Sequence, residues 1–391
     1  MKLFQLTLFH GNISFSDLKN YCFINLVLQR ALSKIFFLAE RRGSLIFIKG
    51  EIMKSIYKKI GATFISAIAT VNVMALDELN VAYFEEWPMP FEYAKQIGAY
   101  DEALGMKVNW KAFGTGTAMS AAMASGDIHI SVSQGVPPFI VAASTGQDIQ
   151  IVDVAVSYAD NDNCVVATGL EIDASNASEL AGKKVSVPLG TAAHFGFLKQ
   201  MSHFGVSVDS MEVVDMAPPE GAAAFAQGSI DMFCGWGGSL RRALDHGNVL
   251  LTGAEKTALG ILVWDVTSVP ASFADENAEI LTTFLDVTAA ANAMWNSGDY
   301  HDVMIPLIAK DAGMDQAATA DTMSTFVFPS VGEQLGDSWL GGSGEAFLKG
   351  VADVFVEAGS IPSARGSYAN AINSAPLEAV AVSQFMRFMG N

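Results

Sequence analysis

Apolar and polar positions alternate in two similar rounds along residues 76–391. In the first round, short apolar runs typical of strands lie at 79–84, 107–113 and 127–133. In the second round, comparable runs lie at 183–188, 211–216 and 229–235. Segments with helical spacing stand between them, and matching elements are about 100 residues apart. The pattern therefore indicates an internal repeat of strands and helices.

This repeat predicts the fold class. Strands that alternate with helices are typical of parallel sheets covered by helices on both faces. Two rounds predict two similar α/β lobes, each a mostly parallel sheet flanked by helices. A single doubly wound enzyme domain would give the same alternation and stays open as an alternative.

The composition allows a large hydrophobic core and argues against nucleic acid as a partner. The chain is 51% apolar and 16% charged, so its 391 residues suffice for two packed domains. Its formal net charge of −18 disfavours nucleic acid, whose phosphates are bound by Lys and Arg. The three cysteines lack the spacing of a zinc site. We expect no metal and no cofactor.

The first 75 residues differ from the rest in charge. They hold ten of the 23 basic and three of the 41 acidic side chains, which leaves residues 76–391 with a formal net charge of −25. Residues 53–75 have a basic start, a short apolar run and small residues before Ala75, which predicts a secretory signal. A short uncleaved anchor is the alternative. We expect residues 1–52 to be an over-extended start or a poorly ordered leader, without a function of their own.

Export would place the protein in the periplasm and allow a disulfide. The chain is expected to cross between lobes near the polar stretch "YADNDNCVVATG" (158–169) and to return at "LGILVWDVTSV" (259–269). We therefore assign 76–160 and 260–391 to lobe 1 and 161–259 to lobe 2. Cys164 and Cys234 would then lie on neighbouring strands of lobe 2, where they can pair.

Helix starts after the strands are candidates for binding an anion. In open α/β sheets, ligands bind outside the carboxyl ends of the strands, and the free amides of helix starts favour negative charge. Neither a GxGxxG nor a GxxxxGK[ST] pattern stands there, which disfavours a nucleotide. The candidates are the capping residues and the first helical turns, namely Thr115, Thr117, Gly135, Val136, Thr191, Ala192 and His194.

Acidic and aromatic side chains at other strand ends suit a cation. Glu86 and Trp87 stand in the stiff stretch "EEWPMP" (85–90), and a carboxylate beside a π-face suits an ammonium group. Asp265 lies in an apolar run and needs a partner, either a structural donor or a cationic ligand group. Trp236 can form a wall of the same site. The polar residues of the first crossing, whose spacing does not suit calcium, complete the candidates: Asn161, Asp162 and Asn163.

Several segments together resemble a known family. They are Val187-Pro188 with His194, "HFGV" (203–206), "PPEGAAAFAQGSID" (218–231), "GW" (235–236), "WDV" (264–266) and "FLKGVADVFVEAGSIPSA" (347–364). In this order they resemble the taurine-binding component of bacterial ABC importers, within the group of binding proteins for sulfonates, nitrate-like anions and thiamine precursors. The resemblance covers most of 79–385. It implies a two-lobed periplasmic binding protein fold with one solute in the cleft.

The resemblance also implies a function and partners. Such proteins are not enzymes; they close on one solute and present it to an inner-membrane ABC permease driven by a separate ATPase. We expect a monomer that binds a small zwitterion such as taurine. The turn of Thr191, Ala192 and His194 matches the family's anion-holding turn, although Ala192 replaces a common hydroxyl residue. Asp265 matches a position that suits the amine. Asn163 replaces a Glu, for which Glu86 is the expected substitute.

Two other functions stay open. An aromatic wall favours quaternary ammonium, so a binding protein for a betaine or a sulfonium osmolyte is one alternative. An enzyme related to thiamine-pyrimidine synthases is the other. His194 is present for it, but no Lys follows a strand nearby and no Cys-rich motif appears.

Overall fold

The structure is a computed structural model that describes residues 76–390 except Leu262. The expected leader at 1–52 and the secretory signal at 53–75 lie outside the described residues, so both stay predictions. Residues 76–391 form one compact unit. None of its described helices combines the length and the apolar character that a membrane crossing requires.

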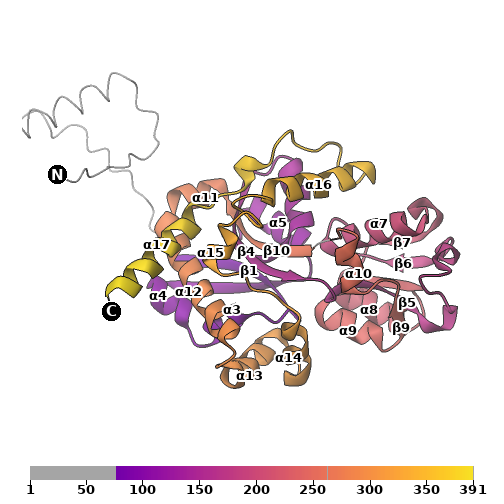
Figure 1. Cartoon of the computed structure of the whole chain (residues 1–391), viewed down its shortest axis with the longest axis horizontal. Helices are drawn as coiled ribbons and strands as arrows, with labels where there is room; N and C mark the ends of the chain where they lie inside the picture. Colours follow the sequence, from indigo (N-terminus) through magenta and orange to yellow (C-terminus); the bar gives the residue numbers. More distant parts are fainter. Residues whose placement is uncertain (1–75, 262, 391) are drawn as a thin grey trace, which may run out of the picture. The chain divides into compact units, whose positions relative to one another are not determined.

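Two five-stranded mixed sheets organise the described chain (Figure 1). The first has the order β2-β1-β3-β10-β4 and the second has the order β7-β6-β8-β5-β9. In each sheet the first three strands are parallel, and the fourth is antiparallel to both of its neighbours. The strands are β1 (Glu78–Phe84), β2 (Lys107–Phe113), β3 (Ile130–Gly135), β4 (Ile149–Tyr158), β5 (Asp162–Ala167), β6 (Lys184–Ser186), β7 (Glu212–Val214), β8 (Met232–Trp236), β9 (Gly247–Val249) and β10 (Val263–Pro270).

The antiparallel strand of each sheet begins where the chain has just left the other sheet. The chain passes from the first sheet to the second between Tyr158 and Asp162, and it returns between Val249 and Val263. We call the part built on the first sheet lobe 1 and the part built on the second sheet lobe 2. The predicted fold class, two α/β lobes with mostly parallel sheets, is confirmed. The lobe boundaries at 160/161 and 259/260 stay predictions.

Helices cover both faces of the sheet in lobe 2. Because strand side chains alternate between faces, Cys164 packs with Phe197 of α7, whereas Val165 packs with Phe225 of α8 and Leu240 of α9. Figure 1 shows α7 on one side of β6 and β7, with α8 and α9 on the other. The helices are α7 (Ala192–Phe204), α8 (Pro218–Ala226), α9 (Gly237–Leu244) and, after β9, α10 (Gly253–Ala258).

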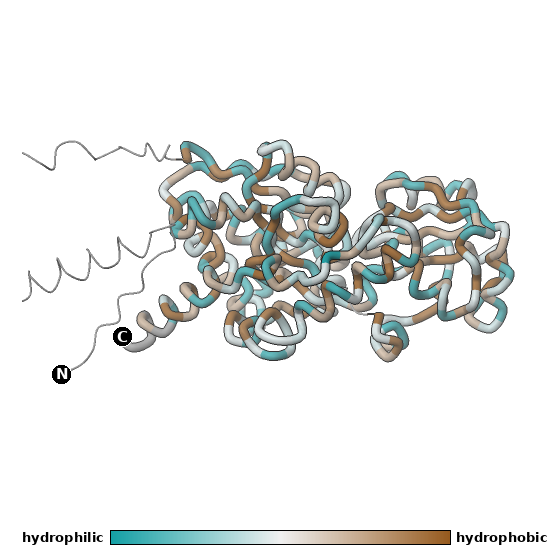
Figure 2. The backbone as a smooth tube through the Cα atoms, turned by 90° about the horizontal axis from the view of Figure 1, so that it is seen from above, coloured by the Kyte–Doolittle hydropathy of each residue, from teal (hydrophilic) through white to brown (hydrophobic). Residues whose placement is uncertain are grey.

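Lobe 1 has the larger core, which includes the helices after β10. Apolar stretches run along the backbone inside both lobes (Figure 2). Two short helices follow β1, because Gly98 takes a left-handed φ of 74° between them. The helices are α3 (Pro90–Gln96), α4 (Ala99–Leu104), α5 (Gly116–Ala124), α6 (Val136–Ser144), α11 (Ala271–Glu276), α12 (Ala278–Ser297), α13 (His301–Ala312), α14 (Gln316–Ser324), α15 (Val331–Gln334), α16 (Gly344–Glu357) and α17 (Ala375–Gly390).

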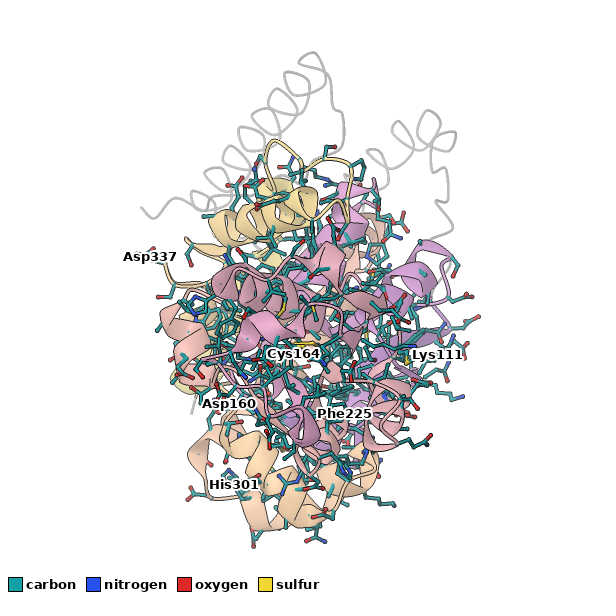
Figure 3. The ribbon with its side chains drawn as sticks, turned by 90° about the vertical axis from the view of Figure 1, so that its right-hand side faces the viewer. Lys111, Asp160, Cys164, Phe225, His301 and Asp337 are labelled. Atoms are coloured by element: carbon teal, nitrogen blue, oxygen red, sulfur yellow. A yellow bond between two sulfur atoms is a disulfide. The ribbon has the colours of Figure 1, made fainter. Side chains whose placement is uncertain are left out.

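Cys164 and Cys234 form a disulfide in lobe 2 (Figure 3). They stand directly opposite each other in the register of β5 and β8. Both are buried against α7. The bridge therefore ties the strand that enters lobe 2 to the centre of its sheet, and it is the pair that the sequence analysis expected.

Candidate ligand site between the lobes

A cavity with an empty volume of about 270 Å³ lies between the two lobes. This figure includes space open to solvent, and the cavity volume proper is about 20 Å³, room for about one water molecule, so a solute has to move the lining side chains apart to enter. We call it the interlobe cavity. Lobe 1 lines it with Phe84, Trp87, Gly116, Gly135, Pro138, Tyr158 and Asp265, and lobe 2 lines it with Thr191, Ala192 and Trp236.

Helix starts from both lobes supply one kind of wall. Gly116 begins α5 and Ala192 begins α7, and both line the cavity. The caps Thr115 and Thr191 accept the third N–H of each helix, from Ala118 and from His194. The first two N–H groups of each helix have no intrahelical acceptor, so they are free to bind an anion.

The start of α6 contributes less hydrogen bonding. Gly135 is its N-cap and Pro138 lines the cavity. Positions two and three of this helix are Pro137 and Pro138, which have no N–H. Only the N–H of Val136 remains in that turn, so α6 offers mainly its dipole.

Another part of the wall is formed by Asp265, which accepts hydrogen bonds from two hydroxyl groups. The Ser133 hydroxyl donates to Asp265 Oδ2 over 2.8 Å, and the Tyr158 hydroxyl donates to Oδ1 over 2.7 Å. The Trp87 indole Nε1 donates to Ser133 Oγ over 2.9 Å. Trp87 and Tyr158 also meet edge to face, with ring centroids 4.8 Å apart. The carboxylate is therefore held in one orientation among aromatic rings.

Burial raises the pKa of Asp265 to about 7, against the hydrogen bonds from Tyr158 and Ser133 that favour its charged form. The nearby charge of Asp162 raises it further. Such a carboxyl is costly to ionise without a counter-charge. An ammonium group in the cavity would supply that charge.

Backbone strain gathers at this wall. Among the described residues other than Gly, only Glu86, Ser133 and Glu171 have positive φ, at 53°, 59° and 52°. Ser133 joins Trp87 to Asp265, and Glu86 directly precedes Trp87. A positive φ is unfavourable for residues with a Cβ and is typical of functional sites. Two of the three strained residues thus support the acid's surroundings.

A second buried acid lies close by in lobe 2. Asp162 is 2% exposed, and its Oδ2 has no hydrogen-bond partner among the described residues. Burial raises its pKa to about 7, while the positive charge of Lys256 lowers it. Lys256 is also buried and donates to the backbone oxygen of Asp162. Asp162 is not among the residues that line the interlobe cavity.

Glu86 connects the lobes outside the cavity. Its Oε1 lies 2.7 Å from Arg242 Nη1, and its Oε2 accepts from Arg242 Nη2 and from Ser239, each over 3.1 Å. Its backbone oxygen accepts the N–H of Gly238 over 3.2 Å. The start of α9 is therefore occupied by backbone contacts with the segments that join the lobes, since Gly237 also donates to the oxygen of Asn161.

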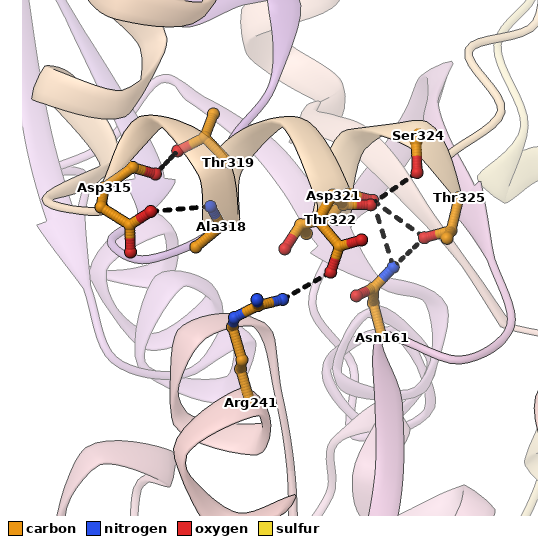
Figure 4. A network of polar contacts seen from close by, with 9 residues as sticks. All are labelled: Asn161, Arg241, Asp315, Ala318, Thr319, Asp321, Thr322, Ser324 and Thr325. Carbon is orange, nitrogen blue, oxygen red and sulfur yellow. Dashed lines mark hydrogen bonds and ion pairs between the residues drawn. The ribbon is translucent and has the colours of Figure 1, made fainter.

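Helix α14 makes a further set of contacts with lobe 2 (Figure 4). Arg241 Nη1 lies 2.5 Å from Asp321 Oδ2. Asn161 Nδ2 donates to the Thr322 oxygen over 3.3 Å and to Thr325 Oγ1. These contacts hold the first crossing segment and α9 against lobe 1.

The structure brings together six of the residues predicted for the site and places the others around them. Trp87, Gly135, Thr191, Ala192, Trp236 and Asp265 line the cavity. His194 is buried with its Nδ1 accepting from the Gly190 N–H, and burial lowers its pKa to about 4. Asn163 donates to the Leu251 oxygen inside lobe 2. Thr115, Thr117, Val136, Asn161, Asp162 and Glu86 adjoin the lining residues in sequence or in space, and their ligand roles stay predictions.

Sequence reasoning missed four lining residues and one supporting residue. Phe84 and Tyr158 are the last residues of β1 and β4, so the position of strand ends could have found them. Gly116 and Pro138 lie within helical turns already chosen as candidates. Ser133 carried no signal, because its role depends on strand pairing between β3 and β10.

Comparison with known proteins agrees with the resemblance noted in the sequence. The sequence profile of the NMT1/THI5 like family matches residues 89–296, more than half of the chain. The taurine-binding periplasmic protein of Escherichia coli (strain K12) is 26% identical over 222 residues, which are 57% of this chain and 68% of that protein. Across the curated relatives that match, the aligned part spans 59–68% of their length.

Two solved structures have the same fold. The periplasmic aliphatic sulphonate binding protein SsuA from Escherichia coli matches with a TM-score of 0.58 and 22% identity, over 74% of this chain and 95% of that one. The alkanesulfonate-binding protein SsuA from Xanthomonas axonopodis pv. citri bound to MOPS matches with a TM-score of 0.63 and 19% identity, over 77% and 99%. The resemblance noted in the sequence is confirmed: the chain belongs to the NMT1/THI5 like family and is homologous to periplasmic taurine- and sulfonate-binding proteins.

Proposed function

We propose that this protein is the solute-binding component of an ABC importer and that it binds taurine or a related amino-sulfonate in the interlobe cavity. One observation carries the proposal. The same small cavity is lined by free helix starts and by Asp265 among aromatic rings. Such a cavity is complementary to a short zwitterion.

The helix starts of α5 and α7 would hold the sulfonate. A sulfonate stays charged at neutral pH and accepts hydrogen bonds through three oxygens, so amides suffice to bind it. The two helices belong to different lobes, so an anion between them would draw the lobes together. The formal charge of −25 over residues 76–391 does not oppose this, since distant charges are screened beyond about 10 Å at 0.1 M salt.

Asp265 would hold the amine. Its two donors, Ser133 and Tyr158, leave the carboxylate oriented in the wall of the cavity. Trp87 and Trp236 offer faces that attract a cation. Aromatic walls also suit a betaine, but the relatives with taurine or sulfonates in their names favour the amino-sulfonate.

Isothermal titration of the purified protein tests this function. We expect taurine to release heat with one site per chain, isethionate, which lacks the amine, to bind more weakly, and glycine betaine to bind worst. Absence of heat with taurine and with every alkanesulfonate would reject the anion site. Tighter binding of betaine than of taurine would replace the amino-sulfonate by a methylated zwitterion.

The proposal includes export and a membrane partner. Homologues of this chain are periplasmic binding proteins, which supports a periplasmic location and delivery to an inner-membrane permease with its ATPase. We propose that the protein acts as a monomer and releases its ligand unchanged. Incubation with taurine, followed by mass spectrometry of the ligand, tests the last point, because any conversion product would indicate an enzyme.

A further inference from the structure

A second, larger hollow adjoins the interlobe cavity. It has an empty volume of about 930 Å³ and is lined from both lobes. Three acidic residues line it, Glu85, Glu86 and Asp311, together with the apolar residues Phe113, Pro218 and Pro219. We call it the acidic hollow.

Two rings belong to the walls of both spaces. Phe84 and Trp236 line the interlobe cavity and also line the acidic hollow. Their ring centroids are 5.7 Å apart, with the planes tilted by 55°. Phe84 is the last residue of β1 in lobe 1, and Trp236 is the last residue of β8 in lobe 2. The two rings therefore meet across the gap between the lobes.

We propose that Phe84 and Trp236 form a partition that limits the length of the ligand at its amine end. The inference rests on the proposed function, since it refines which amino-sulfonates the same site accepts. A substituent on the amine would have to displace a packed ring before it could enter the acidic hollow. Displacing packed side chains is costly, so the partition selects a short, unsubstituted amine.

The residues of the acidic hollow determine which substituents on the amine could bind there once the partition is removed. Glu86 is paired with Arg242 and Asp311 is paired with Lys95, whereas Glu85 is exposed and has no ion-pair or hydrogen-bond partner among the described residues. Acids above apolar surface suit a bulky substituent that carries or adjoins a positive nitrogen. N-substituted taurines have this form.

Ring-removal variants test the partition. Phe84→Ala and Trp236→Ala are titrated separately with taurine and with N-cyclohexyltaurine. We expect the unaltered protein to bind N-cyclohexyltaurine about 100-fold more weakly than taurine. Each variant should narrow this gap by binding N-cyclohexyltaurine about tenfold more tightly than the unaltered protein does, and not merely by losing taurine affinity. Phe84→Leu, which keeps an apolar side chain, replaces the alanine variant if the latter does not fold.

Phe113→Ala is the matched control, because Phe113 lines the acidic hollow but not the interlobe cavity. It enlarges the hollow without opening the partition and is expected to leave the gap unchanged. The partition is refuted if folded ring variants bind N-cyclohexyltaurine no more tightly than the unaltered protein, or if the unaltered protein binds both ligands equally. Absence of sulfonate binding by the unaltered protein rejects the proposed function, and the partition with it.

Discussion

Each lobe places one carboxylate at the same point of its sheet. Asp265 on β10 stands opposite Gly135, the last residue of β3, and Asp162 on β5 stands opposite Trp236, the last residue of β8. Both acids thus lie on the antiparallel strand, beside the end of the third parallel strand. Burial raises the pKa of each to about 7.

The two acids differ in their partners. Asp265 accepts hydrogen bonds from Ser133 and Tyr158 at the cavity wall. Asp162 has a buried oxygen without a hydrogen-bond partner among the described residues, and its charge is offset by Lys256. Equivalent positions in a repeated fold therefore have different surroundings: lobe 1 orients its acid at the cavity wall with two hydroxyl donors, whereas lobe 2 offsets the charge of its acid with a lysine.

Exchanging each acid for its amide gives the largest expected difference. Asp265→Asn removes the counter-charge of a buried ammonium, which should weaken taurine binding about 100-fold. Asp162→Asn should weaken it less than about tenfold, because the amine would not contact this side chain directly. Titration calorimetry measures both. Isethionate, which has no amine, should lose little affinity in either variant.

A control separates ligand binding from general damage. Asp153 is another buried acid of lobe 1, and it accepts hydrogen bonds from Gln334 and Thr267 away from the cavity. Asp153→Asn should lower the thermal unfolding temperature but leave taurine affinity unchanged. If Asp162→Asn weakens taurine binding as much as Asp265→Asn does, the proposed difference between the two acids is wrong, and both hold the amine.

The pH dependence of binding tests the same acid without a mutation. Burial raises the pKa of Asp265 to about 7 in the empty protein, so protonation below that pH competes with the ammonium group. Taurine affinity should therefore fall by up to about tenfold per pH unit below pH 7. Isethionate affinity should stay nearly flat. A taurine profile equally flat between pH 5 and 8 would mean that no acid in the site titrates on binding.

Disturbing the contact between Gly237 of lobe 2 and Glu86 should have a smaller effect on taurine affinity. Gly237 has a φ of 55°, and a Cβ there would collide with the Glu86 backbone oxygen. Gly237→Ala should hinder approach of the lobes and weaken taurine binding about tenfold. Gly298→Ala is the matched control, because Gly298 has a φ of 78° with open space around its Cβ position. Equal affinity losses in both variants would assign the effect to backbone strain alone.

The pH dependence of stability gives the smallest effect. The folded-state pKa of Asp162 is about 7, above the usual value of 3.8, so the folded protein holds this proton over a range where the unfolded chain has lost it. The thermal unfolding temperature of the empty protein should therefore decrease as the pH rises from about 4 to about 7. Asp162→Asn should reduce this decrease by a few degrees. An unchanged slope in the variant would show that Lys256 neutralises Asp162 fully.

The amino-acid sequence by itself determined several of the local elements and one of their caps. The strand runs at 79–84 and 107–113, the cap Thr191 and the placement of Asp265 in an apolar run depend on neighbours a few residues away, so the pattern was sufficient for them. It also indicated two lobes, because the same order of strands and helices occurs twice.

Only the tertiary structure decided which polar groups meet. Ser133 and Tyr158 reach Asp265 because β10 pairs with both β3 and β4 across more than 100 residues of chain. Glu86 was expected beside the ligand, yet it pairs with Arg242, 156 residues further along. Such contacts depend on strand register and on how the lobes approach, and neither leaves a local pattern in the sequence.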